Sequence, residues 1–173
     1  KALQMFQREA QILSRIEHPR IARVFDYFVE NGRHYMLLEY IEGRNLRAFI
    51  EQEGARSEAV VREWAQQLGE ILKYLHGLDP PVIHRDLTPS NMILEKDGAI
   101  TLVDFGAANT FIGTATGTVV GKSSYIPLEQ FKGKATPASD YYALGCSLFY
   151  FLTARDPRPF SESNPGEIPA LEI

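Results

Sequence analysis

Cysteine is nearly absent from this 173-residue chain, which contains only Cys146. A single cysteine excludes an internal disulfide and is typical of proteins that fold in a reducing compartment. No Cys and His spacing typical of a zinc site occurs either. The chain also lacks any apolar run of about 18 residues, so we expect no transmembrane helix within it.

Positive charge is modest, with 18 Lys and Arg against 22 Asp and Glu and a formal net charge of −4. No basic stripe is visible, so a nucleic-acid partner is not expected. The hydrophobic share of 45% and the charged share of 23% are typical of a globular protein with a real core. The chain begins at Lys1 within a helical pattern and ends in a proline-rich stretch, so we expect a fragment of a longer protein.

Apolar periodicity predicts several helices. Ser57 is a candidate N-cap of one of them, with Glu58 favourable in its first turn. The helical patterns cover residues 1–17, 46–52, the stretch from Val60 to Leu75 after Ser57, and 138–154.

Shorter apolar runs predict strands. The turn sequences "ENGR" and "EKDG" each separate two such runs and predict hairpins. The predicted strands are residues 21–29 with 34–40, and 92–94 with 100–103. Residues 106–122 are rich in Gly, Thr and Ala without a period, and we expect a long functional loop there.

Polar residues recur at fixed intervals between Val82 and Gly106. His84-Arg85-Asp86 is followed five residues later by Asn91, and Asp104 opens an Asp-Phe-Gly triplet 13 residues after Asn91. Phosphoryl transfer from ATP needs oxygen ligands for Mg²⁺ and a carboxylate that orients the attacking hydroxyl. The spacing H-R-D-x-x-x-x-N with D-F-G supplies both, with Asp86 as the base and Asn91 and Asp104 as metal ligands.

On these motifs the chain resembles a eukaryotic-type (Hanks-type) serine/threonine protein kinase domain of the kind also found in bacteria, truncated at both ends. The resemblance implies an α+β, protein-kinase-like fold that is mostly the helical C-lobe, with helix αC and two strands of the N-lobe. It assigns residues 1–38 to the remainder of the N-lobe, 39–45 to the hinge and linker, and 46–173 to an incomplete C-lobe.

The same resemblance implies a set of nucleotide-binding residues. Glu9 resembles the helix αC Glu that pairs with an ATP-binding Lys. The segment "MLLEYIEGRNL" resembles the connection between the lobes, with a gatekeeper, a hinge that binds adenine through backbone groups, and a ribose neighbour. The implied cofactor-binding residues are Glu9, Leu38, Glu39, Tyr40, Ile41, Asn45 and Ile93.

Two further segments match the family beyond the catalytic motifs. "YIPLEQ" resembles the A-P-E element, with Glu129 as its Glu, and "SDYYALG" resembles a buried helix whose Asp140 braces the catalytic loop. The apolar positions that match the family's stack between the lobes are Leu13, Val24, His84 and Phe105, for which an ordinary core role stays open. His76 is expected to be structural rather than catalytic.

The chain departs from the family pattern at several points. No glycine-rich loop and no ATP-binding Lys precede Glu9, and no Arg of the later helices is present to pair with Glu129, which we expect to be unpaired. Thr88 replaces the usual Lys after Asp86, and Lys122 stands where a Thr is usual. We hypothesise that Lys122 supplies the missing positive charge; a solvated loop residue is the alternative.

These predictions together define the expected function. The catalytic candidates are Asp86, Arg85, Thr88 and Lys122. Arg85 implies activation through a phosphate on the loop, for which the candidates are Thr110, Thr114, Thr116 and Thr118. The expected activity is ATP- and Mg-dependent phosphorylation of Ser or Thr in protein substrates by a cytoplasmic domain, with no nucleic acid and no membrane contact in this segment, although the fragment alone is expected to be inactive. A pseudokinase acting as a binding module and a small-molecule kinase of the aminoglycoside or choline type stay open.

Overall fold

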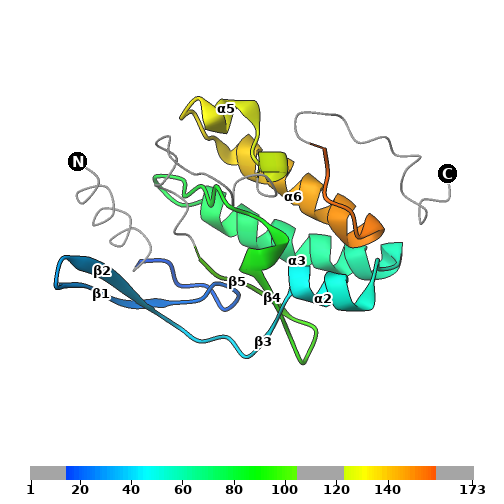
Figure 1. Cartoon of the computed structure of the whole chain (residues 1–173). Helices are drawn as coiled ribbons and strands as arrows, with labels where there is room; N and C mark the ends of the chain where they lie inside the picture. The colour runs from blue at the N-terminus through cyan, green and yellow to red at the C-terminus, as the bar shows by residue number, and fades with distance from the viewer. Residues whose placement is uncertain (1–14, 105–122, 159–173) are drawn as a thin grey trace.

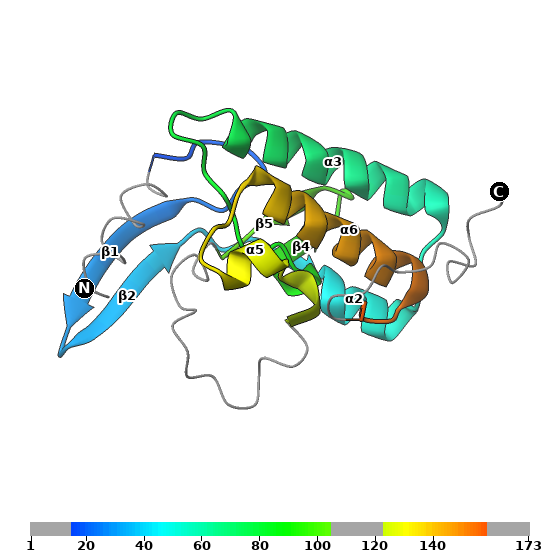
Figure 2. The same ribbon diagram turned by 90° about the horizontal axis from the view of Figure 1, so that it is seen from above.

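The computed structural model describes residues 15–104 and 123–158, which form a helical body with a two-stranded hairpin projecting from one side (Figures 1 and 2). Several predictions concern residues outside these ranges. They are those for Glu9, Leu13, Phe105 and Lys122, for the loop 106–122 and for the four candidate threonines. Residues 15–17 are not helical, so the described end of the first predicted helix is shorter than expected.

The hairpin joins β1 (Val24–Glu30) to antiparallel β2 (Arg33–Leu38). Asn31 and Gly32 form its turn with φ values of 51° and 72°. Positive φ at both central residues is the geometry of a type I′ turn, which Asn-Gly favours and which matches the twist of the strands. The predicted hairpin is therefore confirmed, and the phenyl ring of Phe28 stacks on Tyr35 with centroids 5.2 Å apart.

A second sheet has the order β3-β4-β5, with β3 (Gly43–Asn45) and β5 (Ile100–Leu102) on either side of β4 (Met92–Glu95). The β4–β5 hairpin was predicted, whereas residues 43–45 were assigned to the hinge and linker and not to a strand. Gly43 explains the difference: a Cβ there would lie 2.5 Å from the carbonyl oxygen of Leu94. Only glycine allows the chain to approach β4 this closely.

The helices follow the predicted periodicity closely. They are α2 (Leu46–Glu53), α3 (Glu58–His76) and α6 (Pro137–Thr153), with a short α5 (Leu128–Phe131) before α6. A capping box between Thr136 and Ser139 begins α6, with Pro137 in its first turn. Ser57 is the N-cap residue of α3, as predicted, and its backbone is extended, but its side chain makes no capping hydrogen bond.

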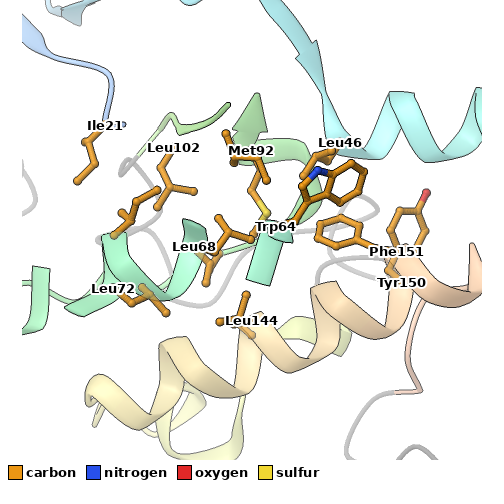
Figure 3. Packing of buried hydrophobic residues seen from close by; sticks show 14 of the residues in the cluster. Ile21, Leu46, Trp64, Leu68, Leu72, Met92, Leu102, Leu144, Tyr150 and Phe151 are labelled. Atoms are coloured by element: carbon orange, nitrogen blue, oxygen red, sulfur yellow. The ribbon is translucent and has the colours of Figure 1, made fainter. Parts of the chain in front are cut away.

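The core lies where α3 packs against α6 and both meet α2 and the β4–β5 hairpin (Figure 3). Trp64 on α3 contacts the edge of Phe151 on α6, with ring centroids 5.3 Å apart. Leu68 and Met92 are fully buried beside them. This packing fixes the position of β4 and β5, and therefore of the loop before β4 and of Val103 and Asp104 after β5.

Cys146 lies on α6 and is half-buried. Burial raises the pKa of its thiol to about 11, although a hydrogen bond with Tyr142 opposes the shift. At neutral pH the side chain is therefore a protonated thiol, which is the unreactive form.

Candidate active site

Asp86 and Asn91 lie together at the start of the β4–β5 hairpin. The Nδ2 group of Asn91 donates to the carbonyl oxygen and to Oδ2 of Asp86, both at 2.9 Å. The loop between them is closed by backbone bonds from Thr88 N–H to Asp86 and from Asn91 N–H to Thr88, and η1 (Pro89–Asn91) forms its last turn. Each of the two side chains is only 6% exposed. The five-residue spacing therefore places a carboxylate beside an amide.

Asp140 holds the preceding two residues of this loop from α6. Its Oδ2 accepts from the backbone N–H of His84 and its Oδ1 from that of Arg85, each at 2.9 Å. Arg85 has a φ of 67°, a left-handed conformation that costs a non-glycine residue free energy. The expected bracing contact is thus present, and it supports a strained residue directly before Asp86.

His76, at the end of α3, also binds Asp140, with Nε2 and Oδ2 2.8 Å apart. The His76 side chain and the Asp140 carboxylate are nearly inaccessible to solvent. The sequence suggested a structural role for His76 without indicating its partner, because the two residues are 64 positions apart. The contact links α3, α6 and the loop before Asp86.

Asp104 follows β5, and Val103 N–H donates to the carbonyl oxygen of Asn91 at 2.9 Å. This bond places the residue before Asp104 against the end of the Asp86–Asn91 loop. Asp104 is exposed and has a φ of 57°. Carboxylate and amide oxygens are the ligands that a hard divalent cation prefers, and Asn91 Oδ1 makes no hydrogen bond within the described segments. Asn91 and Asp104 therefore fit a Mg²⁺ site.

His84 lies close to the carboxylates of Asp140, Asp86 and Asp104 and is completely buried. Burial lowers the pKa of its imidazole, although the charges of Asp140, Asp86 and Asp104 act in the opposite direction. Its Nδ1 accepts from the backbone N–H of Asp86 at 3.3 Å, a bond that requires an unprotonated nitrogen. The neutral imidazole therefore belongs to the folded state.

The lowered pKa of His84 predicts a loss of stability in acid. Below about pH 6.5 the imidazole is protonated in the unfolded chain, whereas in the folded chain it stays neutral until its lower pKa is reached. The free energy of unfolding therefore decreases as the pH is lowered through that window. We expect His84→Asn to show a flatter pH dependence than wild type in urea unfolding of the full-length protein between pH 7 and 5. Burial also lowers the pKa of His18, so His18→Asn is measured alongside to separate the two contributions. An unchanged slope in His84→Asn would contradict the assignment.

The predicted nucleotide-binding residues lie along β2, the following connection and the second sheet. Tyr40 is 87% exposed and Leu38 is also exposed at the end of β2. The N–H of Glu39 donates to Arg23, and none of the backbone hydrogen bonds seen in residues 15–104 involves Ile41. Asn45 and Ile93 face each other in the β3–β4 register, but the Oδ1 of Asn45 caps α2 by accepting from Ala48 N–H at 2.8 Å.

Thr88 is buried, 4% exposed, and its hydroxyl has no hydrogen-bond partner in the described part of the chain. An unsatisfied buried hydroxyl costs free energy that a valine of the same shape would not.

Two members of the expected stack, Val24 and His84, are among the described residues. Val24 packs on the core and His84 is fully buried, so both contribute to the interior.

The segment before α6 contacts the loop through Gln130, which the sequence did not single out. Gln130 Nε2 donates to the carbonyl oxygen of Arg85 at 2.6 Å. Glu129 was expected to be unpaired, but its Oε1 accepts a hydrogen bond from the hydroxyl of Ser139 at 2.8 Å. A short polar side chain on α6 thus contacts Glu129 within the described residues.

Arg47 on α2 joins η3 (Ser123–Tyr125) to the segment after α6. Its guanidinium donates twice to the carboxylate of Asp156, at 2.5 and 3.3 Å, and once to the hydroxyl of Tyr125. Tyr125 in turn donates to Asp156 at 2.8 Å, and Arg47 lies over the ring of Tyr150. Burial, followed by the bond to Asp156, raises the pKa of Tyr125, so its hydroxyl stays protonated. Sequence spacing gave no signal for this cluster.

The helical body, the small sheets and a loop that pairs Asp86 with Asn91 ahead of Asp104 form the arrangement that the resemblance to protein kinases implies. Residues 1–170 match the family model described as the protein kinase domain. Serine/threonine-protein kinase B of Synechocystis sp. is 35% identical over 181 residues, covering 96% of this chain and 31% of that protein. Serine/threonine-protein kinase PknA of Nostoc sp. is 37% identical over 175 residues, covering 94% and 31%.

Solved structures agree with this assignment. The crystal structure of Rad53 1-466 in complex with AMP-PNP superposes with a TM-score of 0.70 at 28% identity, covering 94% of this chain and 40% of that one. The apo form of PpkA-294 gives a TM-score of 0.75 at 30% identity, covering 91% and 56%. The chain belongs to the protein kinase domain family and has the predicted kinase-like fold. It spans about a third of the length of the curated relatives it matches.

The part of the chain that the structure describes contains no helix long and apolar enough to cross a bilayer. Over the same residues, no group of three or more His, Cys, Asp or Glu side chains is arranged to hold a metal ion. The Asn91–Asp104 pair is a smaller set that includes an amide.

Proposed function

We propose that the full-length protein transfers the γ-phosphoryl group of ATP to Ser or Thr hydroxyls of protein substrates. The observation that carries the proposal is the paired Asp86 and Asn91, held on a braced loop next to Asp104. The names of the relatives support the same activity, since several are serine/threonine-protein kinases. Pro89 within the loop favours Ser or Thr over Tyr as the acceptor.

Asp86 would orient the acceptor hydroxyl and take its proton. The Asn91 amide, which donates to Asp86 Oδ2, holds this carboxylate in one orientation. Asn91 Oδ1 and the carboxylate of Asp104 would hold Mg²⁺, which when bound neutralises charge on the phosphates. Adenine would contact the backbone of residues 39–41, where the backbone of Ile41 makes no hydrogen bond to another described residue. At Asn45 only Nδ2 remains for a ribose, because Oδ1 caps α2.

The proposal is tested with labelled ATP, Mg²⁺ and a generic protein acceptor. We expect label on Ser and Thr of the acceptor, lost when the metal is chelated and restored when Mg²⁺ is added back. Nucleotide binding without transfer would instead identify a pseudokinase. Transfer to aminoglycosides or choline but not to protein would identify a small-molecule kinase.

Thr88 and Lys122 form a second part of the proposal. We infer that Lys122 supplies the positive charge that the usual Lys provides at position 88, because Thr88 and Lys122 are exchanged relative to the family pattern. A charge-assisted hydrogen bond contributes roughly 1.5–3 kcal/mol, so Lys122→Thr should lower turnover by about tenfold or more.

The exchange of these two residues tests their coupling. Thr88→Lys in the Lys122→Thr background should recover part of the lost turnover in the same labelled-ATP assay. If each single change leaves turnover as it is in wild type, the coupling is absent and Lys122 is a solvated loop residue.

A further inference from the structure

The peptide group directly before Asp86 is held at both ends. Its carbonyl, on Arg85, accepts from Gln130 Nε2 at 2.6 Å, and its N–H, on Asp86, donates to His84 Nδ1 at 3.3 Å. Because a peptide group is planar, fixing its two polar atoms fixes the plane that contains the Cα of Asp86, from which the side chain extends. Gln130 therefore acts on the orientation of Asp86 without touching its carboxylate.

Gln130 is also the last link of a closed ring of hydrogen bonds. Arg85 N–H donates to Asp140, and Ser139, the neighbour of Asp140, donates through its hydroxyl to Glu129. Glu129 directly precedes Gln130 in the chain, and Gln130 donates to the carbonyl oxygen of Arg85, which closes the ring. Two adjacent residues of α6 and two adjacent residues of α5 thus enclose the one strained residue of this loop.

The short helix α5 depends on such polar contacts for its position. It has four residues, none of which is buried, and Leu128 and Phe131 are largely exposed. A left-handed residue such as Arg85 persists only where its surroundings determine its conformation. The bond from Gln130 to Arg85 therefore connects the placement of α5 to the conformation before Asp86.

We propose that Gln130 is a positioning residue that couples α5 to the orientation of the Asp86 carboxylate. The inference rests on the proposed function, in which Asp86 is the base. A purely structural role would change stability alone, whereas a positioning role changes turnover at constant nucleotide affinity.

The experiment compares Gln130→Met with Gln67→Met in the full-length protein. Both variants remove a glutamine amide that bonds to backbone, because Gln67 donates to Gly98 and accepts from Ile100 N–H on the far side of the β4–β5 hairpin. Small displacements of a catalytic group can cost about a hundredfold in rate. For Gln130→Met we expect kcat to fall about ten- to a hundredfold with KM for ATP within about twofold. For Gln67→Met we expect lower thermal stability and unchanged kcat.

A double variant separates the two ideas on which the inference depends. On the Asp86→Asn background, Gln130→Met should cause no further loss of kcat, because no base is left to position. Gln130→Glu keeps the shape but presents a carboxylate that cannot donate to the carbonyl, and should lose as much turnover as Gln130→Met. If Asp86→Asn is harmless, the proposed function fails. Two outcomes refute the positioning role when Asp86→Asn itself lowers kcat. Either Gln130→Met leaves kcat unchanged, or Gln130→Met lowers kcat on the Asp86→Asn background by as much as it does in wild type.

Discussion

Replacement of Asp140 by alanine is expected to lower the free energy of unfolding by about 2–6 kcal/mol. The carboxylate is fully buried and accepts from the buried N–H of His84 and the partly buried N–H of Arg85, so its removal leaves two donors unsatisfied, each costing about 1–3 kcal/mol. It also removes the partner of His76 Nε2 and the support of the strained Arg85 backbone. Urea unfolding of the full-length protein measures the loss.

Asp97→Ala is the matched control for this change. Asp97 also accepts a backbone N–H, that of Ala99, at 2.9 Å, but it does so on the exposed β4–β5 turn. Water can replace this acceptor, so a loss below about 1 kcal/mol is expected. Asp140→Asn keeps one oxygen acceptor and should fall between the two. Equal losses in Asp140→Ala and Asp97→Ala would show that burial of the network adds nothing.

Asp86→Asn is expected to reduce kcat about 10²- to 10⁴-fold, the range typical of removing a general base. An asparagine oxygen can still accept from Asn91 Nδ2, so the loop geometry and nucleotide affinity should remain close to wild type. The measurement is kcat by labelled-ATP transfer, together with calorimetric binding of a non-hydrolysable ATP analogue.

The control for Asp86→Asn is Asp97→Asn, which makes the same chemical change on the exposed turn and should leave kcat unaltered. A large fall in analogue affinity in Asp86→Asn, without a fall in kcat at saturating ATP, would assign Asp86 to nucleotide binding. Turnover equal to wild type would remove it from the chemistry altogether.

Local sequence signals predicted those elements whose causes are local. Asn31-Gly32 specifies its own turn, and the apolar stripe of α3 follows directly from helical spacing. The three residues of β3 carry no such signal, because their pairing depends on the close approach of Gly43 to Leu94 across a large sequence separation. The N-cap position of Ser57 was predicted correctly, but a favourable residue type does not ensure that its side chain makes the capping hydrogen bond.

The candidate site divides in the same way. The Asp86–Asn91 pair depends on a five-residue spacing, so a motif could predict it. Contacts of His76 with Asp140 and of Gln130 with Arg85 join residues 64 and 45 positions apart, and no pattern in one sequence marks such partners. Glu129 accepts a hydrogen bond from the hydroxyl of Ser139 on α6, a contact that depends on how α5 packs against α6.

Arg47 also bears on how this domain changes in evolution. One guanidinium contacts Asp156, Tyr125 and the face of Tyr150, so the loss of Arg47 alone would remove the cation that pairs with Asp156 and leave that carboxylate bonded to the Tyr125 hydroxyl. Single substitutions at these positions would pass through a less fit intermediate. We therefore expect Arg47, Asp156 and Tyr125 to be inherited as a set and to be exchanged together in diverging lineages.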